Sequence, residues 1–194
     1  TVVTLAIVSR YLHLREYGVA MLLLQGLLRR YPRDVSLLCL VVRVYLQAGN
    51  LLRAEEHLRR SEYIVSQHGD HRNAARVQLS RAFMAMANRK FADAVAIFQA
   101  VIDRHPDHTV AVNNKAIALL FSQQLGEAIA LLEDVIQRKP ERFLTERLVF
   151  NLCTMYDLQS DCGAQKKKHI LSQVQRHCSD DFDYSMAKLP TESS

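Results

Sequence analysis

The feature that most constrains the fold is one pattern repeated twice between Ala75 and Arg142. Pro106 and Pro140 stand 34 residues apart, and the same interval separates three pairs of small or β-branched residues: Ala82 and Ala116, Ala94 and Ala128, and Val101 and Val135. A fixed period of this length, with small residues at set places, indicates helical hairpins stacked on one another. The sequence therefore predicts an all-α solenoid.

The repeated residues resemble the tetratricopeptide (TPR) repeat. Small residues stand at the eighth and twentieth positions, Phe98 and Leu132 at the twenty-fourth, and proline at the thirty-second, although the aromatic residue of the fourth position is absent. The resemblance implies a right-handed superhelical solenoid of antiparallel helix pairs, here with a C-terminal capping helix. It also implies an interaction scaffold rather than an enzyme.

Extending this register outward predicts four repeats, at about 1–34, 35–74, 75–108 and 109–142. In the first repeat we expect helices at Val2–Leu14 and Tyr17–Tyr31, and before the second we expect Asp34 to cap the helix. The second repeat holds six extra residues, which we place within 63–73 as a longer helix and a polar turn. A helix at 142–158, a break at 160–163 and a capping helix at 164–178 complete a single solenoid over 1–178. A polar, partly mobile tail follows at 179–194.

Composition narrows the function classes. Glycine is scarce, with 6 in 194 residues, which argues against a nucleotide-binding α/β fold. The longest apolar stretches, such as Leu37–Val42, are far shorter than the ~20 residues that span a bilayer, so we expect no membrane insertion. Four scattered cysteines favour buried thiols in a reducing compartment. The chain opens on a repeat boundary without a methionine or leader, as we expect of a fragment of a longer protein.

In a TPR solenoid the first helix of each repeat lines the concave groove, mainly through positions two, five, nine and twelve. The expected partner-binding residues at these positions are Leu5, Leu12, Cys39, Arg43, Leu46, Arg76, Leu79, Phe83, Met86, Asn113, Ile117 and Leu120. Apolar residues replace the lysine of the family's carboxylate clamp, and only Asn113 and Asn114 match it, so a buried C-terminal carboxylate would lack cationic donors. The groove instead favours the apolar face of a partner helix, or the apolar residues of the tail at 182–189. The alternative is that these inner residues pack on one another between neighbouring repeats.

We find no catalytic or metal-binding pattern. The pairs His68 and His71, and His105 and His108, could chelate a metal by spacing, but they lie in turns between repeats. Cys162, His169, His177 and Cys178 are spaced too loosely for a closed tetrahedral site. Phosphate-binding loops, nucleophile elbows and paired carboxylates on an apolar ground are absent from the sequence. We therefore predict no enzyme, no cofactor and no small-molecule substrate.

The basic run Lys166, Lys167 and Lys168 has two interpretations. The first is an exposed, solvated helix face. The second is an electrostatic contact with an acidic protein or with lipid headgroups. Nucleic-acid binding is disfavoured because no aromatic residues interleave with these lysines.

The C-terminal third carries a more specific resemblance. Residues 131–136 (LLEDVI), Pro140, and the segments 150–158 (FNLCTMYDL) and 165–168 (QKKK) resemble the end of the subunit 12 family of the trafficking protein particle (TRAPP) complex, although the tail from Cys178 departs from it. The resemblance implies a non-catalytic subunit of a vesicle-tethering complex in ER-to-Golgi transport, with other subunits as its partners. It implies a cytoplasmic protein peripheral to ER and Golgi membranes, with a nuclear location as a further expectation. The alternative is a stand-alone TPR adaptor or co-chaperone that binds peptide segments in its groove.

Overall fold

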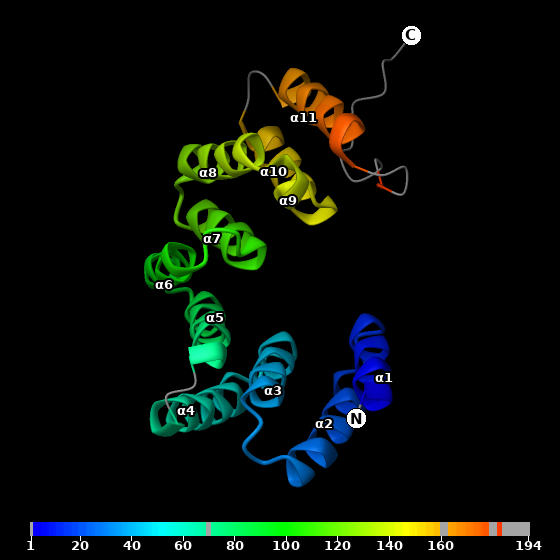
Figure 1. Ribbon diagram of the computed structural model, residues 1–194, viewed down its shortest axis with the longest axis vertical. Coiled ribbons are helices and arrows are strands. Elements are labelled where there is room, and N and C mark those ends of the chain that lie inside the picture. The colour runs from blue at the N-terminus through cyan, green and yellow to red at the C-terminus, as the bar shows by residue number, and fades with distance from the viewer. Residues whose placement is uncertain (1, 69–70, 160–162, 179–181, 184–194) are drawn as a thin grey trace. The chain divides into compact units, whose positions relative to one another are not determined.

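The computed structural model describes residues 2–68, 71–159, 163–178 and 182–183, and within these ranges it is built from α-helices without strands (Figure 1). The helices are α1 (Val2–His13), α2 (Tyr17–Arg30), α3 (Val35–Gln47), α4 (Leu51–His68), α5 (His71–Ala87), α6 (Phe91–Arg104), α7 (Thr109–Phe121), α8 (Leu125–Arg138), α9 (Pro140–Phe143), α10 (Glu146–Leu158) and α11 (Gly163–His177). Helices of 12–18 residues alternate with short turns in antiparallel pairs: α1 packs on α2, α3 on α4 and α7 on α8. This is the architecture that the 34-residue period predicts.

The chain divides into two compact units, Thr1–Ile97 and Phe98–Ser194. Unit one holds α1 to α5 and the first half of α6, and unit two holds the rest of α6 and α7 to α11. The sequence-based boundary of a single solenoid over 1–178 stays a prediction.

Small residues bring the two helices of each hairpin together. Alanine occupies the twentieth position of all four repeats, and Ala20, Ala54, Ala94 and Ala128 are completely buried. Val8, Val42, Ala82 and Ala116, at the eighth position, are buried as well. Because a short side chain at each crossing lets two helices approach closely, the core of each unit forms along these contacts.

The turn inside every hairpin contains one residue with positive φ. These residues are Arg15, Gly49, Arg89 and Gln123, with φ of 59°, 76°, 60° and 64°, and all four occupy the fifteenth position of their repeat. The left-handed conformation reverses the chain so that the second helix can start two residues later. Three of the four turns adopt it without glycine, which is why the sequence did not reveal this regularity.

The helix ends agree with the sequence in the first repeat and differ elsewhere. The predicted helices of the first repeat are α1 and α2, each ending one residue earlier than predicted, and the Asp34 carboxylate accepts a hydrogen bond from the Leu37 amide at 3.0 Å, as predicted for a cap. The six extra residues of the second repeat are divided between two helices. Helix α4 is extended to 18 residues, and α5 begins at His71, four residues before the repeat boundary. Residues 69–70 of the predicted turn lie outside the described residues.

The helix predicted at 142–158 is interrupted. A single turn, α9, ends at Phe143, and α10 begins at Glu146 after Thr145, whose hydroxyl accepts from the Leu148 amide at 3.4 Å. This threonine caps a new helix start, so Leu144 lies in the connection between α9 and α10 rather than inside the predicted helix. Gly163, assigned to the break, is instead the first residue of α11, and residues 160–162 lie outside the described part of the chain.

Among the described residues, no helix is both long enough and apolar enough to cross a bilayer.

A larger side chain at a hairpin crossing should destabilise the fold. Replacing the buried Ala128 by leucine should lower the free energy of unfolding by about 1–3 kcal/mol through overpacking. The same change at Ala130, which is exposed on the same helix, should alter it by less than about 0.5 kcal/mol. Thermal unfolding followed by circular dichroism measures both, and an unchanged midpoint for Ala128→Leu would show that the repeat register is wrong.

The turn conformation gives a second test. Gly49→Ala should lower the free energy of unfolding by about 1 kcal/mol, because a Cβ is strained at a φ of 76°. Gly26→Ala is the matched control: Gly26 lies inside α2 with nothing within 4 Å of an added Cβ, so alanine there should stabilise by about 0.5–1 kcal/mol. Urea unfolding of both variants measures the difference, and equal stabilities would contradict the left-handed turn.

Candidate protein-binding faces

The twelve predicted partner-binding residues lie on the first helix of each hairpin. Leu5 and Leu12 lie on α1, Cys39, Arg43 and Leu46 on α3, and Arg76, Leu79, Phe83 and Met86 on α5, all in unit one. Asn113, Ile117 and Leu120 lie on α7 in unit two. Each unit therefore contributes a separate candidate face.

The best-defined face of unit one lies along the packed pair α3 and α5. The Arg43 guanidinium lies over the Phe83 ring, 5.8 Å from its centroid, in a cation–π contact. Leu46 and Met86, one turn further along their helices, are half-buried. The charge of Arg43 therefore lies beside an aromatic ring on this face.

A polar contact joins the other end of the same two helices. Arg76 Nη1 donates to the Ser36 hydroxyl, which in turn donates to Asn73 Oδ1 at 3.3 Å. The exposed side chain of Arg76 is thereby tied to α3. We refer to Ser36, Arg43, Leu46, Arg76, Phe83 and Met86 as the α3–α5 face; it combines apolar side chains with two cations and contains no acidic residue.

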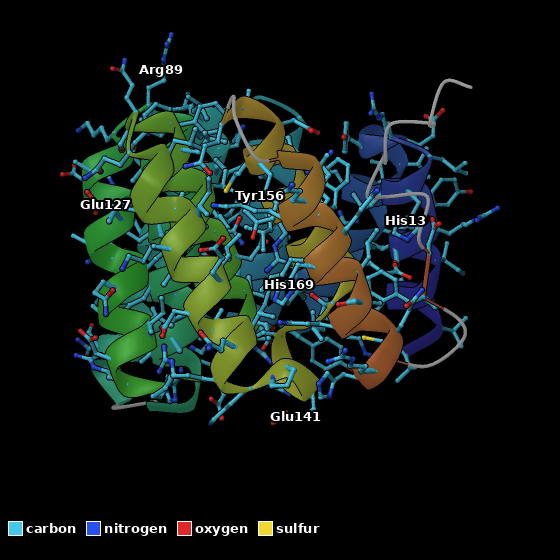
Figure 2. All side chains as sticks on the ribbon, turned by 90° about the horizontal axis from the view of Figure 1, so that it is seen from above. His13, Arg89, Glu127, Glu141, Tyr156 and His169 are labelled. Atoms are coloured by element: carbon cyan, nitrogen blue, oxygen red, sulfur yellow. The ribbon has the colours of Figure 1, made fainter. Side chains whose placement is uncertain are left out.

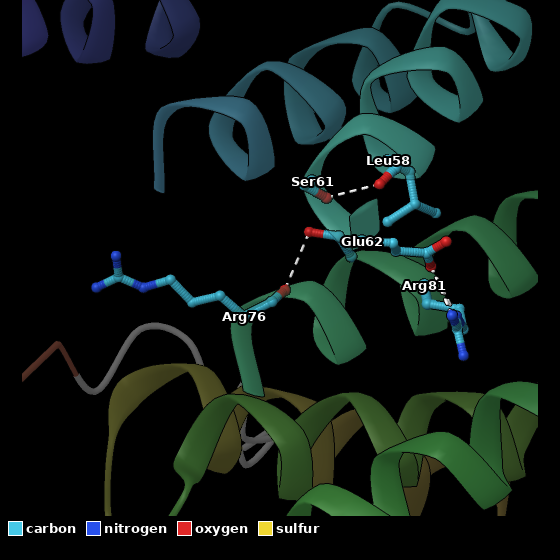
Figure 3. Close-up of polar contacts among 6 residues, drawn as sticks. Leu58, Ser61, Glu62, Arg76 and Arg81 are labelled. Carbon is cyan, nitrogen blue, oxygen red and sulfur yellow. Dashed lines mark hydrogen bonds and ion pairs between the residues drawn. The ribbon is translucent and has the colours of Figure 1, made fainter. Parts of the chain in front are cut away.

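Two residues predicted to line this face are buried instead. Leu79 and Cys39 point into the interior, because α3 packs against both α4 and α5 and residues at the fifth position fall between them. The Cys39 thiol lies near the hydroxyls of Ser80 and Ser61. Ser80 donates to the Arg76 carbonyl at 3.1 Å, and Ser61 donates to the Leu58 carbonyl at 2.7 Å (Figure 3). Burial raises the pKa of Cys39 despite the lowering effect of these serines and nearby arginines, so the thiol stays protonated at neutral pH.

On α1, the predicted residues are more open. Leu5 is exposed and Leu12 is half-buried, with Leu12 packed against the core cluster that contains Val8 and Leu24. Their role as contact residues stays a prediction.

In unit two, the predicted contact residues lie on α7, beside a pocket of about 450 Å³ between α7 and α10. Its lining residues are Thr109, Val110, Asn113, Asn114, Thr145, Glu146, Arg147 and Leu148. Asn113 is almost completely buried, and its Oδ1 accepts from Asn151 Nδ2 at 2.7 Å, so it orders the pocket floor rather than an open surface. Ile117 and Leu120 are half-buried further along α7.

Sequence reasoning missed the α10 side of this pocket. Thr145 and Arg147 belong to the start of α10, and Asn151 lies one turn further on. The sequence predicts one continuous helix at 142–158, which contains Thr145 and leaves no helix start at this point. The Ser/Thr-x-x pattern before an apolar run is the signal that could have located it.

The basic run on α11 is not a uniformly exposed face, contrary to the first interpretation. Lys167 is only 2% exposed, and its Nζ lies 2.6 Å from Asp157 Oδ2 on α10. Lys166 is half-buried, with Nζ 5.2 Å from the centroid of the Tyr156 ring and 3.1 Å from Gln159 Oε1. Only Lys168 is exposed. The run therefore attaches α11 to α10, because successive lysines on a helix point in different directions.

A second pocket of unit two, of about 440 Å³, lies among α8, α10 and α11, where Figure 2 labels Tyr156 and His169. The Tyr156 hydroxyl donates to Glu133 Oε1 at 2.8 Å. Burial, followed by this hydrogen bond, raises the pKa of Tyr156 far above its usual value, so the phenol stays neutral and cannot act as a base. Glu133 accepts from Tyr156 and lies 3.6 Å from Lys166 Nζ, so this carboxylate is paired within unit two.

The histidine pairs show one structural role. His108 caps α7, where its Nδ1 accepts from the Ala111 amide at 3.3 Å, and His105 is exposed. The side chains of His68 and His71, and the whole of Cys162, lie outside the described residues. In the rest of the chain, no group of three or more His, Cys, Asp or Glu side chains is arranged to hold a metal ion.

Comparison with known proteins agrees with this architecture. Residues 85–145 match the tetratricopeptide-repeat family model. The chain is 29% identical over 177 residues to "Trafficking protein particle complex subunit 12" of Mus musculus and to the same subunit of Homo sapiens. The match covers 91% of this chain but only 22% and 24% of those proteins, so the chain spans less than a quarter of their length. The resemblance predicted from the C-terminal segments is confirmed.

Solved structures confirm the fold. A thermophilic TPR protein of Thermus thermophilus has a TM-score of 0.70 at 13% identity, with 92% of this chain and 91% of that chain covered. A tetratricopeptide-repeat protein of Parabacteroides merdae has a TM-score of 0.69 at 18% identity, covering 90% of this chain and 64% of that one. At such identities the likeness concerns the fold alone, and the all-α TPR-type prediction is correct.

Removing the partner of Lys167 should destabilise unit two. Asp157→Asn leaves a buried ammonium without its carboxylate and should lower the free energy of unfolding by about 1–3 kcal/mol, less than for a fully buried pair because Asp157 is more than half exposed. Lys167→Met should be better tolerated, because it keeps the buried stem and removes the charge. Gln175→Ala, at an exposed position of α11, is the control and should change stability by less than about 0.5 kcal/mol. Urea denaturation ranks the three variants, and equal effects at Asp157 and Gln175 would contradict the pairing.

Proposed function

This chain is a tetratricopeptide-repeat protein that resembles subunit 12 of the trafficking protein particle complex, and on that premise we propose that it is a non-catalytic scaffold of a vesicle-tethering complex. It holds other subunits of that complex and acts in transport between the ER and the Golgi. It works in the cytoplasm, peripheral to those membranes. Neither the comparisons nor the structure supports an additional nuclear location.

The α3–α5 face is the observation that carries this proposal. It presents half-buried apolar side chains, Leu46, Phe83 and Met86, beside the cations Arg43 and Arg76. Apolar area on a partner supplies the driving force for association, and the two fixed cations select for carboxylates on that partner. A helix or extended segment with apolar and acidic residues fits these contacts.

An enzyme is the class of protein that competes with the scaffold proposal. Burial raises the pKa of the thiols of Cys39 and Cys153 and of the phenol of Tyr156. Raised values suppress the thiolate and phenolate that nucleophilic or general-base catalysis requires. These side chains therefore support a structural role.

A stand-alone adaptor or co-chaperone is the second candidate function. The pocket between α7 and α10 favours it. Amide side chains both donate and accept hydrogen bonds, so Asn114, with Arg147 in the lining of the same pocket, suits a polypeptide segment. Glu146 lines the same pocket and opposes an acidic peptide. Titration with an acidic C-terminal peptide distinguishes the two: tight, salt-sensitive binding supports the adaptor.

The α3–α5 face can be tested by charge reversal. The double variant Arg43→Glu, Phe83→Glu in the full-length parent should reduce recovery of the associated subunits at least tenfold in affinity purification with quantitative mass spectrometry. It removes the cation–π pair and places carboxylates on the face. Leu79 is unsuitable for such a test because it is buried.

Leu52→Glu is the matched control. Leu52 is 80% exposed on α4 and is not one of the residues of this face, so Leu52→Glu should leave recovery unchanged. Circular dichroism establishes that each variant remains folded. Normal recovery of the subunits with a folded double variant would eliminate the α3–α5 face as their docking site.

A further inference from the structure

A pocket of about 430 Å³ lies in unit one between α2 and α4 (Figure 1), which are the second helices of the first two hairpins. Helix α2 contributes Arg29 from its last turn, and α4 contributes His57 and Arg60. The other lining residues are Gln25, Leu28 and Pro32. In the described part of the chain, the lining of this α2–α4 pocket thus carries two guanidinium groups and no carboxylate.

The Arg60 guanidinium is held in place. Its Nη2 donates to the Pro32 carbonyl at 2.6 Å, so the side chain joins α4 to the turn that follows α2. A guanidinium has five N–H donors, and the others are available to a further acceptor. Glu55 and Glu56, which lie nearby on α4, pair with other arginines of that helix. Among the described residues, neither Arg60 nor Arg29 forms an ion pair with a carboxylate.

His57 supplies a third polar group. Its ring stacks on the ring of Tyr45, with the centroids 5.5 Å apart and the planes 6° from parallel, and this contact fixes its orientation. Burial is the main cause that lowers the pKa of His57, so the imidazole is neutral at neutral pH and carries one N–H. Nδ1 is buried and has no hydrogen-bond partner among the described residues. Nε2 is therefore the ring nitrogen that a ligand in the pocket can reach.

The internal repeat shows that packing does not require these charges. In the 34-residue register, Arg29 and Arg60 correspond to Asp103 of α6 and Asp134 of α8, both in unit two. The glutamine and the proline of the lining are retained there, as Gln99 and Pro106, whereas Leu131 stands in place of the histidine. The same two repeat positions accept either sign of charge, so the cations of the α2–α4 pocket call for an explanation other than the fold.

We propose that the α2–α4 pocket binds a phosphorylated serine or threonine side chain of a partner polypeptide. A phosphate monoester presents three acceptor oxygens and about two negative charges, which match the donors of Arg29, Arg60 and His57. Hydrogen bonds between guanidinium and phosphate are charge-assisted and can be bidentate. The pocket of about 430 Å³ has room for the side chain that carries the phosphate, and Leu28 and Pro32 offer it apolar contact.

Two other anionic occupants fit less well. A carboxylate has only two oxygens and a single charge to set against two cations and a histidine. An anionic membrane is a broad surface and would meet the exposed carboxylates of Glu55 and Glu56 next to the pocket, whereas a single phosphate group enters it. The pocket shares no residue with the α3–α5 face, so this inference goes beyond the proposed function.

The test is an NMR titration of the whole 194-residue chain with the peptide Ala-Leu-Ser-Leu-Ala, phosphorylated on serine and blocked at both ends. The ring signals of His57 and the Nε–H signal of Arg60 should shift and saturate as the phosphopeptide is added. The unphosphorylated peptide should cause no shift. The same peptide with glutamate in place of phosphoserine should bind about tenfold more weakly, because it offers fewer oxygens and less charge.

Variants locate the site. Arg29→Asp with Arg60→Asp, which installs the residue type of the equivalent positions in unit two, should weaken phosphopeptide binding at least tenfold and keep the helical circular dichroism. His57→Leu should weaken binding without lowering the thermal midpoint, because it removes a buried nitrogen that lacks a partner. Arg59→Ala, at an exposed position of α4 outside the pocket, is the matched control and should change the affinity less than twofold.

Three outcomes would overturn the inference. The first is equal phosphopeptide affinity of the wild-type chain and the folded double aspartate variant. The second is inorganic phosphate binding as tightly as the phosphopeptide, which would indicate a site for a free anion only. The third is sedimentation with phosphatidylcholine vesicles that contain phosphatidylinositol 4-phosphate, lost in the double aspartate variant, without phosphopeptide binding; it would assign the pocket to a membrane. The Arg43→Glu, Phe83→Glu variant should bind the phosphopeptide normally, so failure of the α3–α5 face is distinguished from failure of this pocket.

Discussion

The close contact of small residues at the eighth and twentieth repeat positions is the constraint on which the structure depends. Ala20, Ala54, Ala94 and Ala128 are completely buried, and the eighth-position residues, none larger than valine, are buried as well. This contact fixes the distance and angle within each hairpin, and the left-handed residue at position fifteen fixes the reversal that precedes it. Once the geometry of a hairpin is fixed, the side chain at each other repeat position points in a fixed direction: toward the next hairpin, toward the previous hairpin, or toward solvent.

That division of directions explains which side chains remain available for partners. Position five falls between packed helices, so Cys39, Leu79 and Asn113 are buried, whereas Arg43 and Phe83 at position nine remain accessible. Leu5, also at position five, is exposed because α1 has fewer packed neighbours than α3. The candidate binding faces of this chain are thus helix faces that the packing leaves accessible.

Charge was a poor guide to exposure at the C-terminal end. Three consecutive lysines suggest a solvated surface, but a helix rotates by about 100° per residue, so they cannot share one environment. Lys167 faces α10 and pairs with Asp157, Lys166 covers the Tyr156 ring, and Lys168 alone faces solvent. The QKKK segment that resembles the subunit 12 family is therefore a packing element here, as is the tyrosine of the FNLCTMYDL helix.

The sequence by itself determined the helical class, the repeat register and the positions of the crossing alanines, because these depend on a local period and on side-chain size. It also predicted the α1 and α2 boundaries to within one residue. Only the tertiary structure decided which predicted contact residues are buried, where α10 begins, and that Arg43 lies over Phe83. Those outcomes depend on contacts between residues far apart in the chain, such as Asn113 with Asn151 and Lys167 with Asp157, which no single helix encodes.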